Sequence, residues 1–301
     1  MRLRPLLLAL IPLAFSTASP ASADPLPVVA TTSVLQDLVR NVGGEKVVVK
    51  TLVGPDGDAH TYEPTPSDAK AISTARLVVI NGLGLEGWLT RLMGSAKFSG
   101  TRVTATDGIT PLTMQEAEGG KPKTIIDPHA WQSLTNGRIY VANIAKGLSA
   151  ADPANASFYQ DNAARYSAEL AALEAKIRAE LSDVPEPKRR VITTHDAFQY
   201  YGKAYGITFI APIGLSTEEG EPSAGDVAKL ERQIKQEKLR ALFLENISNS
   251  KLIEQLARDT GAIVGPPLFS DALSKPDEPA PTYIQMFEYN TATLKAGMLK
   301  N

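Results

Sequence analysis

Short apolar runs alternate with longer stretches of helix-like composition along almost the whole chain. The runs show no polar and apolar alternation, which is typical of strands that are covered on both faces. Strands separated by helices form right-handed βαβ units. The pattern therefore predicts an α/β fold with mainly parallel sheets. The expected strands lie at residues 28–31, 47–52, 77–80, 102–105, 191–193, 208–210, 239–244 and 262–264.

A different periodicity marks the middle of the chain. From residue 154 to 183 there is neither Gly nor Pro, and apolar side chains recur at steps of three and four residues. This spacing predicts one long helix that Asp152-Pro153 opens and that Pro185 and Pro187 end. A helix of about 30 residues is roughly 45 Å long, which is more than one small domain needs. We expect this helix to join two lobes.

The parts on either side of this helix resemble each other. VVATTSVLQD at residues 28–37 parallels RVITTHDAFQ at 190–199, and EPTPSDAK at 63–70 parallels EPSAGDVA at 221–228. The two blocks come in the same order, which favours a duplicated lobe with a ligand site in the cleft between the copies. The expected organisation is a signal peptide at 1–23, an N-terminal α/β lobe at 24–150, a linking helix at 151–186 and a C-terminal α/β lobe at 187–301.

The N-terminus has the layout of a cleavable secretory signal. Basic residues precede a short apolar stretch at 6–15, and small residues precede Asp24. A membrane-spanning helix needs roughly 20 apolar residues, whereas this stretch is shorter and contains Pro12. The chain has no cysteine to carry a lipid. We therefore expect cleavage near Ala23-Asp24 and release into the periplasm as a monomer without a lipid anchor.

Composition excludes several other classes of protein. The chain has 31 basic and 33 acidic residues, so its net charge of −2 gives no electrostatic basis for binding nucleic acid. Without cysteine there can be neither disulfides nor a thiolate metal site.

All three histidines of the chain lie just beyond apolar runs that read as strands, where loops of α/β folds carry functional side chains. His60 is in the loop GPDGDAH, His129 follows the apolar pair in IIDPHAW, and His195 directly follows the predicted strand 191–193. Asp271, in GPPLFSDAL, occupies a place in the second lobe similar to that of His129 in the first. Three imidazoles and one carboxylate suit Zn²⁺, with Mn²⁺ or Fe²⁺ also possible, whereas Ca²⁺ and Mg²⁺ prefer mostly oxygen.

Other acidic residues compete with Asp271 for the carboxylate role. Aspartates in turns often cap helices, so position alone does not select one. Asp127 and Asp196, each close to a histidine in sequence, could instead orient an imidazole through its second ring nitrogen. The competing residues are Asp58, Glu63, Asp127, Asp196, Glu219 and Glu245.

Seven segments in order along the chain carry a resemblance to a known family. They are VVATTSVLQDLV, GPDGDAHTYEPTPSD, DPHAW, TTHDAFQYYGKAYG, STEEGEPSA, LFLENISNSKLIEQLARDTGA and LFSDAL. In these segments the chain resembles the zinc- and manganese-binding solute receptors of bacterial ABC transporters. These receptors are also called metal-binding adhesin-type or cluster A-I proteins. The resemblance implies two α/β lobes joined by one rigid helix and a membrane ABC permease as partner. It implies metal ligands at His60, His129, His195 and Asp271.

The resemblance also bears on the metal. Manganese and iron members often have a glutamate where this chain has His195, so the third imidazole favours zinc. Many zinc members carry a His-rich loop between the first two ligands, and residues 82–123 here contain no histidine. We expect zinc in preference to manganese, as a transported ligand of a protein that is not an enzyme. The alternatives are a zinc-dependent hydrolase, although the chain has no H-E-x-x-H motif, and a receptor for a chelated metal such as a siderophore.

Overall fold

The structure is a computed structural model that describes residues 24–118, 121–211, 224–237, 239–247 and 251–301. The predicted signal peptide at 1–23 lies outside the described residues, as do Glu219 and all but the last residue of the STEEGEPSA segment. No helix among the described residues is long and apolar enough to cross a membrane.

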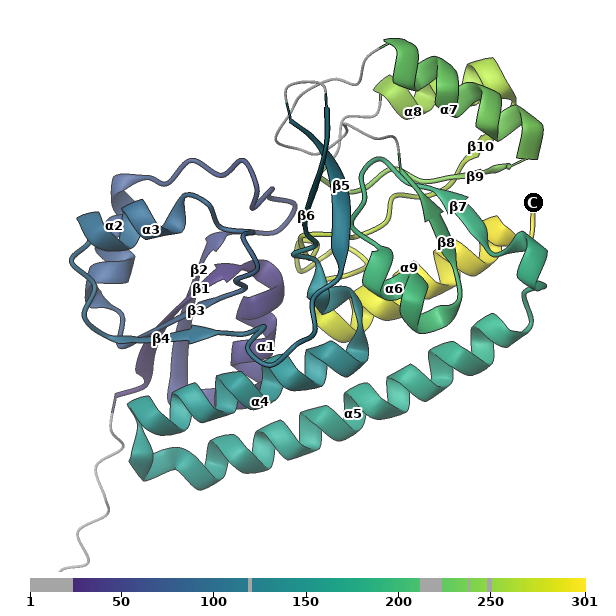
Figure 1. Ribbon diagram of the computed structural model, residues 1–301. Coiled ribbons are helices and arrows are strands. Elements are labelled where there is room, and N and C mark those ends of the chain that lie inside the picture. The colour runs from purple at the N-terminus through teal and green to yellow at the C-terminus, as the bar shows by residue number, and fades with distance from the viewer. Residues whose placement is uncertain (1–23, 119–120, 212–223, 238, 248–250) are drawn as a thin grey trace, which may run out of the picture.

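A four-stranded parallel sheet forms the first half of the molecule (Figure 1). Its strand order is β2-β1-β3-β4. The strands are β1 (Leu26–Thr32), β2 (Val47–Val53), β3 (Leu77–Ile80) and β4 (Thr101–Thr104), and the helices between them are α1 (Ser33–Gly43), α2 (Pro66–Thr74) and α3 (Leu89–Ser95). Val28, Val29 and Ala30 of the central β1 are buried, as expected for a strand that is covered on both faces.

A second four-stranded parallel sheet repeats this plan with the order β10-β9-β7-β8. The strands are β7 (Arg190–Ile192), β8 (Thr208–Ile210), β9 (Ala241–Leu242) and β10 (Ile263–Val264), and the helices are α6 (Gln199–Tyr205), α7 (Ala224–Glu237), α8 (Lys251–Thr260) and α9 (Tyr283–Met298). In both sheets the first strand lies between the second and the third, and the fourth lies beyond the third. The eight predicted strands are confirmed, and the shared order agrees with a duplication.

Two antiparallel helices, α4 (Leu134–Ala151) and α5 (Ala156–Ser182), run along one side of the molecule (Figure 1). The predicted long helix is thus confirmed as α5, with 27 residues. Its apolar stripe is buried at Tyr159, Ala163, Tyr166, Leu170, Leu173, Ile177 and Leu181. Helix α5 contacts α1 and α4 in the first half and α6 and α9 in the second, so it braces both. Short 3₁₀ turns lie at Gly44–Lys46, Ala130–Gln132, Pro153–Asn155 and Glu186–Lys188.

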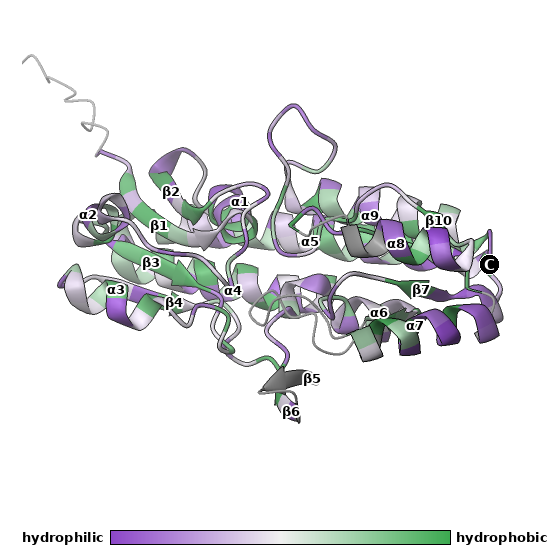
Figure 2. Cartoon of the chain, turned by 90° about the horizontal axis from the view of Figure 1, so that it is seen from above, coloured by the Kyte–Doolittle hydropathy of each residue, from purple (hydrophilic) through white to green (hydrophobic). Residues whose placement is uncertain are grey.

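An antiparallel pair is formed by β5 (Thr113–Glu118) and β6 (Lys121–Ile126), of which only the apolar end of β6 before His129 was predicted. Figure 2 shows it projecting from the body of the molecule. Its described side chains are mostly exposed, although Met114 is buried, so the pair lacks the long apolar run by which a buried strand is recognised. His129 follows this pair and Asp271 follows a parallel sheet, so the expected equivalence of their positions is wrong.

A matched pair of glycines tests the packing of α4 on the first sheet. Gly147 of α4 is buried, and a Cβ atom there would lie 2.1 Å from Cγ2 of Val103 in β4. A Cβ atom on Gly94 of α3 would meet nothing within 4 Å. Alanine in a helix is favoured over glycine by about 1 kcal/mol, whereas overpacking a core costs about 1–3 kcal/mol. We expect Gly147→Ala to lower the free energy of unfolding by up to about 2 kcal/mol.

Gly94→Ala should instead leave the free energy of unfolding unchanged or raise it by up to about 1 kcal/mol. Urea unfolding of the metal-free variants measures both effects. Equal stabilisation by the two substitutions would show that the contact between α4 and β4 is looser than described.

Candidate metal centre

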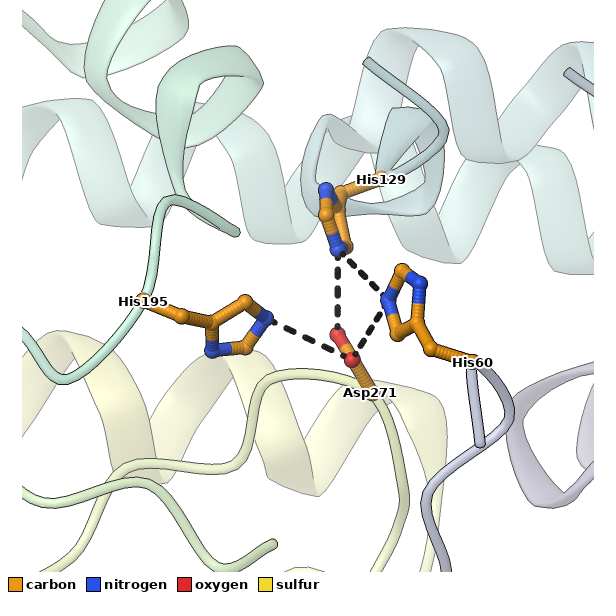
Figure 3. Close-up of side chains that lie close together, drawn as sticks. All are labelled: His60, His129, His195 and Asp271. Carbon is orange, nitrogen blue, oxygen red and sulfur yellow. Dashed lines mark hydrogen bonds and ion pairs between the residues drawn. The ribbon is translucent and has the colours of Figure 1, made fainter. Parts of the chain in front are cut away.

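Four side chains from four separate loops converge where the two halves meet (Figure 3). One nitrogen or oxygen atom of each of His60, His129, His195 and Asp271 lies within 4.8 Å of the others. Nε2 of His60 is 3.2 Å from Nε2 of His129 and 3.2 Å from Oδ2 of Asp271. The Nε2 atoms of His129 and His195 lie 3.6 and 3.5 Å from the Asp271 carboxylate. The structure therefore brings together all four candidates from the sequence.

The cluster is almost completely withdrawn from solvent. The side chains of His129, His195 and Asp271 are 1%, 5% and 1% exposed, while that of His60 is 13% exposed. Both carboxylate oxygens of Asp271 and Nε2 of His195 are buried without a well-aligned hydrogen-bond partner among the described residues. Such atoms are costly to leave unsatisfied. A cation at their common centre would satisfy them.

Opposite charges control ionisation in the cluster. Burial alone would raise the pKa of Asp271, but the charges of His129 and His195 and the contacts with His195 and His60 outweigh it, and the pKa lies well below its usual range. Burial would lower the pKa of His195, yet the carboxylates of Glu245 and Asp271 raise it well above the ordinary value. Asp271 and Asp127 likewise raise the pKa of His129 against the effect of its burial. The neighbouring imidazoles thus stabilise the buried negative charge of Asp271 in the metal-free protein.

Asp127 holds His129 in place, as the sequence suggested. Its Oδ1 lies 2.8 Å from Nδ1 of His129 and also accepts a hydrogen bond from the His129 backbone N–H. This contact leaves Nε2, the other ring nitrogen, directed at Asp271 (Figure 3). A carboxylate that is hydrogen-bonded to the ring nitrogen not facing the metal fixes the orientation of the imidazole. It also makes the other nitrogen a stronger electron donor to a metal.

Glu245, and not Asp196, plays the same part for His195. Nδ1 of His195 lies 2.6 Å from Oε2 of Glu245, and Oε1 of Glu245 accepts hydrogen bonds from Thr194 and from the backbone N–H of His195. Asp196 instead accepts a hydrogen bond from Gln199. The expectation for Asp196 is wrong because Glu245 follows β9, which lies beside β7 in the sheet. Its place after the predicted strand 239–244 was the available signal.

The remaining acidic candidates have other surroundings. Asp58 accepts hydrogen bonds from the backbone N–H of His60 and from the Thr61 hydroxyl, so it shapes the loop that carries His60. Glu63 is exposed.

Two asparagines, one after the third strand of each sheet, support the segments that carry His129 and Asp271. Asn81 follows β3 and donates to the carbonyl of Pro128, next to His129. Asn246 follows β9, accepts a hydrogen bond from the Ser270 N–H and donates to the carbonyl of Ala272. Asn246 therefore contacts both neighbours of Asp271. This role was not predicted from the sequence.

The segments that carry His129 and Asp271 are also bonded to each other. The side chains of Trp131 and Gln132 both donate to the carbonyl of Ser270, at 2.8 and 2.6 Å. The hydroxyl of Tyr283, at the start of α9, donates to the carbonyl of Trp131. These contacts tie the His129 segment of the first half to the Asp271 segment of the second.

Comparison with known proteins gives consistent results. The family described as zinc-uptake complex component A, periplasmic (ZnuA) matches residues 28–297. The chain is 32% identical to the manganese ABC transporter substrate-binding lipoprotein PsaA of Streptococcus pneumoniae, over 98% of this chain and 96% of that protein. It is 33% identical to the metal ABC transporter substrate-binding lipoprotein SloC of Streptococcus mutans, over 94% of each chain.

Solved structures show the same architecture. The periplasmic zinc-binding protein TroA from Treponema pallidum superposes with a TM-score of 0.82 at 30% identity, over 92% of this chain and 99% of that one. The manganese-bound periplasmic metal-binding protein from Candidatus Liberibacter asiaticus gives a TM-score of 0.79 at 31% identity, over 90% and 98%. The two-lobe α/β fold with a long helix is therefore shared with these proteins.

The assignment of Glu245 as the partner of His195 can be tested in the metal-free protein. We expect Glu245→Gln to lower the pKa of His195, because the substitution removes an adjacent negative charge while burial still disfavours the imidazolium. The measurement is an NMR titration of the imidazole resonances. Asp196→Asn is the matched control and should change the pKa of His195 much less. The assignment is wrong if the two variants shift that pKa equally.

Proposed function

Because the chain belongs to the family of zinc-uptake complex component A periplasmic proteins, we propose that it captures one divalent transition-metal ion and delivers it to a membrane ABC permease. The observation that carries this proposal is the convergence of three imidazoles and one carboxylate on a single buried point. Four such donors are the complement of a tetrahedral zinc site.

We propose Nε2 of His60, His129 and His195 and the carboxylate of Asp271 as the ligands. Each of these atoms already faces the others, so a small adjustment of side chains would bring them to bonding distance of one cation. The cation would stabilise the buried negative charge of Asp271 directly. The carboxylates of Asp127 and Glu245 would strengthen two of the imidazole ligands.

Zinc is the cargo that the donor set favours. Nitrogen ligands suit zinc, whereas manganese prefers sites with more oxygen. The names of similar proteins include both metals: PsaA is a manganese protein and TroA a zinc protein. The protein from Candidatus Liberibacter asiaticus has structures with manganese and with cadmium bound. Three imidazoles in this chain support zinc in preference to manganese.

A transport role fits the site better than the two alternatives. Catalytic zinc keeps a coordination position open and needs a nearby base. Here Asp271 would close the site, Asp127 and Glu245 are bound to imidazole nitrogens, and Glu63 is exposed. A chelated metal would need a wide cleft, whereas the four ligand atoms lie within 4.8 Å of one another.

The predicted domain boundaries and location complete the proposal. The lobes at 24–150 and 187–301 would be held by the linking segment at 151–186, whose helix limits hinge bending. PsaA and SloC are lipoproteins by name, whereas this chain has no cysteine to which a lipid could be attached. We therefore propose a periplasmic monomer without a lipid anchor.

Metal analysis tests the proposal directly. We expect protein purified without added metal to contain close to one equivalent of zinc by elemental analysis, and zinc to displace manganese in a matched competition. His195→Ala should lower zinc affinity at least about 100-fold, because it removes a ligand and leaves Glu245 buried without its partner. Isothermal titration or a competing chelator measures the affinity.

A control variant for this experiment is Lys295→Met, which removes an ion pair with Asp183 outside the site. It should bind zinc as the parent protein does. The proposed function is wrong if single alanine substitutions of His60, His129 and His195 all leave affinity unchanged.

The affinity for zinc should depend on pH through proton competition. Metal binds deprotonated imidazoles, and the pKa values of His129 and His195 are raised above the ordinary value, so protons compete with the metal for both rings. Binding then releases these protons, and affinity rises with pH and falls as pH falls. We expect a loss of about 10- to 100-fold per pH unit below pH 7. An affinity that stays constant from pH 7 to about 5 would contradict this exchange of protons for metal.

A further inference from the structure

His60 differs from the other three proposed ligands in its setting. It is the most exposed of the four and lies on the loop 54–60 that follows β2. The loop is attached to the first half through the indole of Trp88, which donates to the carbonyl of Ala59 at 2.8 Å. It is shaped internally by Asp58. The cross-links among Trp131, Gln132, Ser270 and Tyr283 described above do not include it.

Asp56 connects this loop to the other half of the molecule. Its backbone N–H donates to the carbonyl of Leu273 at 3.0 Å. Its Oδ1 accepts a hydrogen bond from Asn246 at 3.0 Å, and its Oδ2 lies 3.3 Å from Nζ of Lys275. All three partners belong to the second half, and two of them follow Asp271 within four residues.

The backbone of Asp56 has a left-handed conformation at the third position of a β-turn, in which the N–H of Gly57 donates to the carbonyl of Gly54. Its φ is +56°, in the left-handed region that most side chains avoid, although Asn and Asp tolerate it better than others. Residues in this region persist where the surrounding contacts fix them, often at sites of function. The partners across the junction supply such contacts for Asp56.

Asn246 makes this connection specific to the metal centre. The same side chain that donates to Asp56 contacts the backbone of Ser270 and of Ala272, the residues on either side of Asp271. Displacement of the loop from Asn246 would therefore loosen His60 and the support of Asp271 together.

We propose that Asp56 is a positioning residue: through Asn246 and Lys275 it latches the His60 loop to the Asp271 segment and thereby limits the rate at which bound metal leaves. This inference rests on the proposed function. His129, His195 and Asp271 are buried and braced, so the metal exchanges through withdrawal of His60. The side chain of Lys275 is 61% exposed, so one side of the latch faces solvent.

The experiment is stopped-flow dissociation of zinc into excess chelator. Asp56→Gly removes the side-chain contacts without adding strain, because glycine adopts positive φ freely. We expect it to speed dissociation about tenfold. This factor corresponds to the free energy of one hydrogen bond to a charged group. Asp56→Asn keeps an acceptor for Asn246 and tolerates this φ, so it should speed dissociation only about two- to threefold.

Lys275→Met should also speed dissociation about two- to threefold, and this difference from the parent protein should shrink at high salt because the ion pair is exposed. The matched control is Asp183→Asn, which breaks an aspartate–lysine ion pair at the end of α5. It should leave the rate of dissociation unchanged.

A double-mutant cycle separates this role from a general effect on stability. In a His60→Ala background Asp56→Gly should speed dissociation clearly less than it does in the parent protein, because the latch acts mainly through His60. The inference is overturned if Asp56→Gly dissociates zinc at the parental rate, or if it speeds dissociation equally with and without His60.

Failure of the inference can be distinguished from failure of the proposed function. If the parent protein binds no zinc, the proposed function fails first. If the parent binds zinc and the His60→Ala variant loses affinity, while the Asp56 variants behave like the parent, the latch alone is wrong. The thermal midpoint of the metal-free Asp56→Gly protein provides a structural check and should stay within a few degrees of the parent.

Discussion

The buried carboxylate of Asp271 is the group on which the rest of the structure depends. It contacts all three imidazoles, and its pKa stays well below the usual range because their charges and contacts outweigh the effect of its burial. An isolated carboxylate at this depth would be costly. The two halves must therefore meet so that positive charge, as protons or as a cation, surrounds this point. The bonds from Trp131 and Gln132 to Ser270 keep them in that arrangement.

The repeated topology explains how the site could arise, and two buried glutamates show where the halves diverged. In the first half Glu86 accepts hydrogen bonds from Thr31 and from backbone N–H groups of the loop after β3. In the second half Glu245 has a similar set of donors but also contacts His195. Burial raises the pKa of Glu86, whereas for Glu245 the imidazole outweighs burial and the pKa is lowered. The same place after the third strand thus holds a structural carboxyl group in one half and the partner of a proposed ligand in the other.

The sequence predicted the parts of this arrangement that depend on local pattern. Buried strands and the stripe of α5 follow from apolar spacing, and the three histidines stood out because they are few and follow apolar runs. Glu245 was missed as the partner of His195 because the contact depends on which strands are neighbours in the sheet, and Asp196 was closer in sequence. Apart from the end of β6, the β5–β6 pair was missed because its described side chains are mostly exposed and form no long apolar run. The bond between Asp56 and Asn246 joins positions 190 residues apart, which no local pattern can reveal.

The linking helix constrains how such a site can exchange its cargo. The apolar stripe of α5 is buried along its length, and the helix packs against elements of both halves, so a wide hinge motion would expose much of that surface. Tyr283 and Trp131 add a bond that the same motion would break. Local movement of one loop exposes far less apolar area. The loop that carries His60 bears the most accessible of the four side chains, which is why we place the opening of the site there.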